Sequence, residues 1–353
     1  MAELTSSGEA DDAAPSLGPR GPFPDTPLTR VLERRWLHYA FVSRDLDLGM
    51  VANVASLGSS PGKARRGPFS TAILLLHQRG EGWCASQFNA TTGDPLWSAF
   101  REPHPWGQRS RLDLASVAGS PRVGLDLWRT SSPSTSQCAP FAGDQHLRWQ
   151  AETGVAAEGD WTIGGRVLRG LSAVGYHERV RGYWGWPELG GWVFGFANDT
   201  GGDPAKPPSA AAVFTFISPT HPAEATTASF MLWRHGRLRR HFPRRRVSMA
   251  VRGALDRNRV AQVPHLARLL DVSPMPPIPR RLVIRARAGD AEALLDFEPE
   301  SAARVVIPSE TGLRPFSVHE VVGPCRLEGR IGEDRFGFET RGIVEFAGGA
   351  GGD

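Results

Sequence analysis

Apolar segments of strand length alternate with turn residues along almost the whole chain, and this pattern limits the fold more than any other feature. The 353 residues include 40 glycines and 29 prolines, which are too many for a protein built from long helices. Segments such as 36–42 and 122–128 recur at spacings of roughly 8–12 residues, as in antiparallel sandwiches and barrels. We therefore expect an all-β protein.

The number of expected strands suggests two domains. About fifteen strands are enough for two barrels of roughly seven or eight strands each, and a barrel of eight strands can hold one small ligand. We place these domains at residues 26–183 and 184–353. Residues 1–25 are rich in Gly, Ala, Ser, Pro and acidic residues, which predicts a disordered tail. The run 71–78 is apolar throughout and predicts a strand buried on both faces.

One segment has a helical rather than a strand-like period. A spacing of 3.6 residues predicts the one sizeable helix over residues 256–270, with Pro264 bending or breaking it. The residues on this period are Leu255, Arg259, Val263, Leu266 and Leu270.

Several classes of protein are disfavoured by what the sequence lacks. Cys84, Cys138 and Cys325 form an odd, sparse set without a CxxC pair, which argues against a disulfide framework and a thiolate zinc site. The sequence has no HExxH, P-loop or GxSxG motif, and no dinucleotide fingerprint follows an expected strand. We therefore predict that the protein needs neither a metal ion nor an organic cofactor.

The ends and the hydropathy of the chain suggest its location. No stretch approaches the ~18 uncharged apolar residues of a membrane-spanning helix. The first fifteen residues have neither the basic nor the apolar region of a secretory signal. We expect a cytoplasmic protein without stable membrane insertion. Its oligomeric state stays open.

The formal net charge of +4 is carried almost entirely by arginine, since Lys63 and Lys206 are the only lysines. The densest basic stretch, residues 237–246, contains six arginines. Such a stretch is typical of a phosphate-binding patch and also of a charged sheet edge that prevents aggregation. We favour the edge and predict no nucleic-acid partner, because the sequence has no recognised nucleic-acid-binding motif.

The segment 175–196 resembles a known family. It reads Gly-Tyr-His-Glu-Arg-Val-Arg-Gly-Tyr-Trp-Gly-Trp-Pro over 175–187 and continues as Gly-Trp-Val-Phe-Gly-Phe over 191–196. This resembles the domain junction of the two-domain lipocalin-like proteins grouped with carotenoid 1,2-hydratases, tocopherol cyclases, AttH proteins and certain Diels–Alderases. In that family a Gly-Tyr-His-Asp-His-Asn-Trp-Gly-like motif precedes an aromatic strand. The opening strand at 36–41 and the closing segment 323–349 are also similar.

The resemblance implies two lipocalin-like antiparallel β-barrel domains packed together. It also implies a lipophilic small-molecule substrate. The sequence departs from the family motif at the acidic position, which holds Glu178 rather than Asp. Residues 179–181 are Arg-Val-Arg in place of His-Asn-Trp. These changes argue against simple transfer of the hydratase chemistry, whereas the surrounding glycines and aromatic residues support the fold.

The candidate catalytic residues are Glu178, His177 and Tyr176. A carboxyl group in an apolar cleft lined by tryptophans has a raised pKa and can act as a general acid. The alternative for Glu178 is an ion pair with Arg179 or Arg181 that holds the junction together. In a strand Glu178 shares a face with Tyr176 while His177 points the other way, so one cavity receives at most one of the pair His177 and Glu178.

The predicted ligand cavity is walled by segment 176–194 and by the first strand, because these concentrate aromatic side chains with a few polar groups. Buried core packing is the alternative for each tryptophan, and a polar pair with Glu320 is the basis for including His319. The candidate substrate-binding residues are Trp36, His38, Tyr39, Phe41, Arg181, Tyr183, Trp184, Trp186, Trp192 and His319.

Three functions are compatible with these residues. The first is a cofactor-independent cyclase or isomerase of secondary metabolism, which folds a polyene or polyketide in an apolar cleft and polarises it with a hydrogen-bond donor. The second is a lyase of the carotenoid 1,2-hydratase type, which adds water to a C=C bond. The third is a carrier of an apolar metabolite, which needs the pocket but no perturbed acid.

Overall fold

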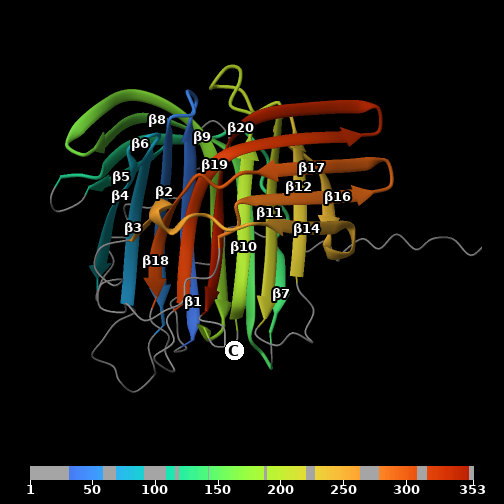
Figure 1. Ribbon diagram of the computed structural model, residues 1–353, viewed down its shortest axis with the longest axis horizontal. Helices are drawn as coiled ribbons and strands as arrows, with labels where there is room; N and C mark the ends of the chain where they lie inside the picture. Colours follow the sequence, from blue (N-terminus) through green and yellow to red (C-terminus); the bar gives the residue numbers. More distant parts are fainter. Residues whose placement is uncertain are drawn as a thin grey trace, which may run out of the picture.

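The structure is a computed structural model, and almost every residue that it describes lies in a β-strand or a turn (Figure 1). The described residues are 32–58, 69–90, 109–115, 119–141, 143–186, 189–219, 227–262, 278–307 and 316–349. Among them, no helix is long and apolar enough to cross a membrane. The expected all-β class is confirmed.

The first half of the chain forms a nine-stranded sheet in the order β4-β3-β2-β1-β9-β8-β6-β5, with β7 paired to β8. All of its pairs are antiparallel. The strands are β1 (Glu33–Ser43), β2 (Leu48–Leu57), β3 (Phe69–Gln78), β4 (Gly82–Ala90), β5 (Ser110–Ala115), β6 (Arg122–Arg129), β7 (Gln137–Pro140), β8 (His146–Ile163) and β9 (Arg166–Tyr183).

The second half forms an eleven-stranded sheet in the order β13-β12-β11-β10-β20-β19-β17-β16-β14, while β18 pairs with both β15 and β19. The pair β15–β18 is parallel. The strands are β10 (Leu189–Asn198), β11 (Ala210–Pro219), β12 (Thr227–Arg234), β13 (Arg237–Pro243), β14 (Val247–Arg252), β15 (Val260–Gln262), β16 (Arg281–Ala288), β17 (Ala291–Phe297), β18 (Ser301–Ile307), β19 (Phe316–Ile331) and β20 (Asp334–Gly349).

The two sheets share one plan. In each, a four-stranded meander is followed by a long hairpin whose second strand returns to pair with the first strand of the meander: β9 with β1, and β20 with β10. The β8–β9 hairpin turns at Gly164 and Gly165, with φ of 57° and 81°, a left-handed conformation that favours glycine. Each sheet is therefore a curled half-barrel. The change of sheet falls between Tyr183 and Leu189, and the predicted domain border at 183/184 stays a prediction.

The predicted helix at 256–270 is the part of the fold prediction that needs correction. Residues 257–259 form a single 3-10 turn, and residues 260–262 form strand β15 instead of helix. Residues 263–270 lie outside the described part of the chain. The physical reason is tertiary: Leu255 and Val260 pack into the core of the second sheet, and Val260 pairs with Ala302 of β18. Contacts with the second sheet therefore bury these residues, and no helix face is needed to bury them.

The described residues form three apolar cores. One lies inside the curl of each sheet, and the third lies between the sheets, with buried residues from both halves of the chain. In Figure 1, β1, β9, β10 and β20 overlap in the middle of the view, at the contact between the halves. β3 contributes to two cores, because Leu74 and Leu76 pack inside the first sheet and Leu75 packs between the sheets. This confirms the strand predicted to be buried on both faces.

Candidate active site between the sheets

Strand β9 carries the junction motif, and its alternation sends successive side chains to different cores. Tyr176 and Val180 pack in the core between the sheets, and Glu178 lies between them on the same face. Two glycines of the motif let the neighbouring strands approach. A Cβ on Gly175 would lie 1.9 Å from the carbonyl oxygen of Ala40, and a Cβ on Gly182 would lie 2.1 Å from that of His146.

Glu178 is buried without an ion pair among the described residues. Its Oε2 accepts a hydrogen bond from the hydroxyl of Tyr176 at 3.1 Å. Burial raises the pKa of Glu178 well above its ordinary value, and the nearby Glu345 carboxyl raises it further, while the Tyr176 hydrogen bond acts in the opposite direction. Glu178 is therefore held as a neutral acid that faces the second sheet.

His38 lies directly opposite Glu178 in the β1–β9 register, and its side chain is buried. Its Nδ1 lies 3.3 Å from the amide nitrogen of Asn53 on β2 and 3.9 Å from a carboxyl oxygen of Glu345. Burial lowers the pKa of His38 to about 3, so the imidazole is neutral. A neutral ring accepts a hydrogen bond at one nitrogen only, and the Asn53 amide is the donor that suits Nδ1.

A second acidic pair comes from the other sheet. Glu320 and Glu345 are opposite each other on β19 and β20. Burial raises the pKa of both, and a hydrogen bond between them raises that of Glu320 and lowers that of Glu345. Glu345 also accepts a hydrogen bond from the indole nitrogen of Trp192. Glu320 is thus the donor in the hydrogen bond between them, and Glu345 is the acceptor.

A narrow pocket lies between Glu178 and Glu345. It leaves about 20 Å³ for the centre of a water molecule, which is enough for roughly one water. Two buried polar atoms among the residues that line it, Trp149 Nε1 and Thr215 Oγ1, have no hydrogen-bond partner among the described residues. The pocket is lined by Trp36, Leu147, Trp149, Glu178, Trp192, Phe194, Thr215, Ile217 and Glu345.

Stacked aromatic rings back this pocket. Trp36 stacks on Trp192 with ring centroids 6.2 Å apart, and Trp192 stacks in turn on Trp186 at 6.1 Å. Trp184 meets Trp36 edge-on at 5.5 Å and is fully buried. Trp36 and Trp192 therefore form the pocket wall, whereas Trp184 and Trp186 form a layer behind it.

The structure places several predicted site residues on the other face of the first sheet. His177 stacks on Tyr39 at 4.2 Å between ring centroids, and its Nδ1 lies 3.0 Å from the carbonyl oxygen of His38. Arg179 pairs with Glu152 at 3.1 Å, and Arg181 pairs with Glu33 at 2.7 Å.

The ion pair considered for Glu178 is therefore absent among the described residues, since both arginines have carboxylate partners on the opposite face. Phe41 is in the same inner core as Tyr39. Tyr183, half-buried, ends β9 opposite Glu33.

His319 is separated from the acids in the same way by the second sheet. It alternates with Glu320 on β19, is fully buried, and lies with Nδ1 3.3 Å from the carbonyl oxygen of Phe346, a residue of the inner core of that sheet. Burial lowers its pKa to about 4. Of the predicted site residues, the structure thus brings together Glu178, Tyr176, His38, Trp36 and Trp192.

Sequence reasoning missed the two acids on the second sheet. Glu345 is not among the candidate residues, and Glu320 enters only as the polar partner of His319. A signal was present, because each is an acidic residue inside a mostly apolar strand segment, 316–322 and 343–347. What the sequence lacks is any indication that both segments face β9.

His38, Glu320 and Glu345 offer the one set of possible metal ligands found among the described residues, with their ligand atoms within 4.8 Å of one another. Protein donors already occupy most of these atoms: Asn53 is at His38, while Glu320 and Trp192 donate to Glu345. A proton shared between Glu320 and Glu345 explains how these two carboxyl groups can lie close together. That no metal is needed stays a prediction.

No family model and no curated protein matches this chain. Solved structures do match it. Kievitone hydratase from Nectria haematococca aligns over 91% of this chain and 90% of its own, with a TM-score of 0.51 and 11% identity. A putative AttH protein from Nitrosomonas europaea aligns over 93% and 98%, with a TM-score of 0.51 and 13% identity.

CghA, in a structure with Sch210972, aligns over 91% of this chain and 90% of its own, with a TM-score of 0.52 and 10% identity. The chain has the fold of these proteins. The resemblance predicted from the junction motif is thereby confirmed at the level of the fold, along nearly the whole length of each chain. Two packed half-barrels of this kind are built by sequences that share about one residue in ten.

Proposed function

We propose that this chain is a cofactor-independent enzyme that holds a lipophilic polyene or polyketide between its two half-barrels and cyclises or isomerises it. The observation that carries the proposal is Glu178, a buried carboxyl group that is kept neutral and faces an aromatic pocket. A carrier has no use for such an acid, whose burial costs free energy. Among proteins of this fold, the kievitone hydratase is an enzyme by its name.

The acids on the two sheets suit different tasks. Burial favours the protonated form of Glu178, which can donate a hydrogen bond or a proton, whereas hydrogen bonds from Glu320 and Trp192 oppose the rise in the pKa of Glu345 and make it the proton acceptor. Groups whose environments drive their pKa values apart are the natural acid and base of a site. Tyr176 holds the Glu178 carboxyl in position through its hydroxyl.

Proton transfer through this pair requires no other reagent. Glu178 donates a proton to a carbonyl oxygen or to an alkene carbon of the substrate, which leaves a polarised or cationic chain. The chain closes a ring or shifts its double bond and then loses a proton to Glu345. Proton exchange between Glu345 and Glu178 restores the starting state, so the product has the mass of the substrate.

The pocket wall indicates the class of substrate. Indole, phenyl and aliphatic groups make up most of the lining and favour an apolar chain, while Trp149 Nε1 and Thr215 Oγ1 can bind one or two oxygen atoms. Ligand pockets usually measure 300–1,000 Å³, and this one has room for about one water. Binding therefore requires the walls to move, and Trp36 and Trp192, which are half-buried, are the side chains placed to do so.

Hydration of a C=C bond is the second candidate. It is favoured by the space for about one water, which is bordered by the two carboxyl groups of Glu178 and Glu345. In that reaction Glu178 protonates the alkene, and Glu345 removes a proton from the water that attacks the cation. The product then gains the mass of one water.

The test uses a panel of linear polyenes and unsaturated polyketides, with binding measured by tryptophan fluorescence and products by mass spectrometry. We expect conversion at unchanged mass by the wild-type protein and loss of about 10²–10⁴-fold in rate for Glu178→Gln, with binding retained. Exposed Glu158→Gln is the matched control. A product heavier by one water would favour the hydratase. Binding without conversion of any member would contradict the enzyme and favour the carrier.

A further inference from the structure

The second sheet carries an unusual density of positive charge at one end. From β13 to β15, residues 237–262 contain nine arginines and a single acidic residue, Asp256. The short 3-10 turn between β13 and β14 consists of Arg244, Arg245 and Arg246 and buries none of them. This segment includes the basic stretch that stood out in the sequence and that the proposed reaction does not use.

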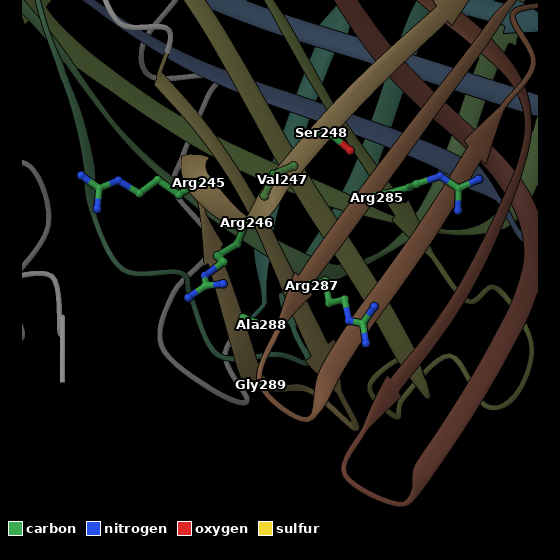
Figure 2. Close-up of a pocket in the computed structure, with 8 residues that line it drawn as sticks. All are labelled: Arg245, Arg246, Val247, Ser248, Arg285, Arg287, Ala288 and Gly289. Carbon is green, nitrogen blue, oxygen red and sulfur yellow. The ribbon is translucent and has the colours of Figure 1, made fainter. Parts of the chain in front are cut away.

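An open groove runs across this region. Its volume is about 420 Å³, and its lining contains four arginines and no acidic residue: Arg245, Arg246, Val247, Ser248, Arg285, Arg287, Ala288 and Gly289. Figure 2 shows the four guanidinium groups spread along the groove, from the 3-10 turn to β16, rather than converging on one point. Spread cations match an extended array of anions better than a single small ion.

These arginines have no carboxylate partners among the described residues. The acidic side chains nearest to them in the sheet pair elsewhere: Asp290 with Arg240, Glu292 with Arg330, and Asp296 with Arg281. Asp256 lies 3.9 Å from Arg280. The positive charge of the groove is therefore left for an external partner.

Exposed apolar side chains lie on the edge strand that borders the groove. Three large hydrophobic residues are exposed in the described part of the chain, and two of them, Met249 at 38% and Val251 at 55%, lie on edge strand β14. They share a strand face with Val247, which lines the groove, whereas Arg285 and Arg287 lie on the opposite face of β16, so the apolar side chains and these arginines flank the same sheet edge. The third, Val167 at 48%, lies on β9 of the other sheet.

We propose that the β14 edge and its basic groove form a docking surface for an anionic lipid bilayer. Arginines bind the phosphate and carboxylate groups of the lipid head groups, while Met249 and Val251 enter the boundary between head groups and acyl chains. Nucleic acid fits less well, because the groove lining has no aromatic side chain to stack on bases. Exposed aliphatic side chains also gain no favourable contact from a phosphate backbone.

This surface is separate from the pocket between the sheets and does not rest on the proposed reaction. Peripheral docking would place the protein where lipophilic molecules are concentrated. It requires no spanning segment, because apolar contacts and charge attraction hold a protein at the interface.

Vesicle co-sedimentation of the full chain tests the proposal. We expect binding to vesicles of phosphatidylcholine with roughly 30 mol% phosphatidylserine, little binding to phosphatidylcholine alone, and loss of binding as salt is raised from about 0.1 M to about 0.5 M. Arg285→Gln with Arg287→Gln should weaken binding by about 10- to 30-fold. Val251→Thr should weaken it by about three- to tenfold.

Matched controls remove the same groups elsewhere. Arg148→Gln with Arg169→Gln takes two exposed arginines from the first sheet, and Val167→Thr removes the other exposed valine; both should bind as the wild type does. Equal weakening by the two arginine pairs would show attraction by net charge alone and would overturn the proposal. So would binding of a single-stranded oligonucleotide or of polyglutamate in preference to vesicles, with no effect of Val251→Thr.

Discussion

Glu320 on β19 lies directly opposite Glu345 on β20, and the buried Glu320 carboxyl shares a hydrogen bond with the half-buried carboxyl of Glu345. The pair faces Glu178 and His38 across the contact between the sheets, so acidic groups from both halves of the chain meet in one apolar core. Such an arrangement is stable only when some of these carboxyl groups are protonated and therefore uncharged. Its properties should therefore depend strongly on pH.

The first prediction concerns the pH dependence of stability. Burial holds the pKa of Glu320 well above its ordinary value, so its contribution is complete at acid pH and is lost as the pH rises toward the folded-state pKa. Glu320→Gln, which stays neutral, should lose less stability between about pH 5 and pH 9 than the wild type, as measured by urea unfolding. Exposed Glu333→Gln should follow the wild type. Parallel curves for all three proteins would contradict the raised pKa.

The second prediction concerns the pH dependence of turnover. The acid form of Glu178 is the active one, so the rate should fall on the alkaline side as Glu178 ionises. The Tyr176 hydrogen bond lowers the pKa of Glu178, and its removal in Tyr176→Phe should move this alkaline limb to higher pH. The measurement is the pH profile of kcat/KM for a converted substrate. A limb that moves to lower pH would contradict the role assigned to Tyr176.

The third prediction separates pocket wall from core. Trp184 is fully buried behind Trp36, so Trp184→Ala should cost about 3–5 kcal/mol of stability. Trp192 is half-buried in the wall, and Trp192→Phe should weaken ligand binding while the protein unfolds cooperatively. Denaturant unfolding and fluorescence titration measure the two effects. A large loss of stability in Trp192→Phe, with affinity unchanged, would return this residue to the core.

The fourth prediction concerns the glycine at the start of the junction motif. A Cβ at Gly175 would lie 1.9 Å from the carbonyl oxygen of Ala40, a contact that only a shift of the β1–β9 pair can relieve. Gly175→Ala should therefore destabilise the protein by about 3 kcal/mol or more, or prevent folding. Gly49→Ala on β2 is the control, because its Cβ would meet the nearest atom at 3.6 Å. Similar melting temperatures for the two variants would show that the strand pair is looser than the structure indicates.

The fifth prediction concerns metal. The partners already present at His38, Glu320 and Glu345 lead us to expect that prolonged dialysis against a chelator changes neither the melting temperature nor the turnover. Loss of either property, restored by one divalent ion and abolished in Glu320→Gln, would identify this cluster as a metal site.

Local pattern was sufficient for the strands and for the separation of His177 from Glu178. A two-residue period sends neighbours to opposite faces whatever the rest of the fold does, and strand β9 follows it. The same reasoning was wrong at residues 256–262, where Val260 pairs with β18 and no helix forms. Periodicity records which residues are buried, and it does not by itself distinguish the partners that bury them.

An all-β chain with turns at its glycines and prolines, an aromatic junction with a candidate acid at Glu178, and a dense run of arginines could all be predicted from the order of the residues. Tertiary structure alone decided that Glu178 meets Glu345 and Glu320, more than a hundred residues away along the chain, and that Tyr39 and His319 face separate inner cores. The reason is physical: alternation is a property of each strand, whereas the packing of two sheets depends on the summed burial of both faces.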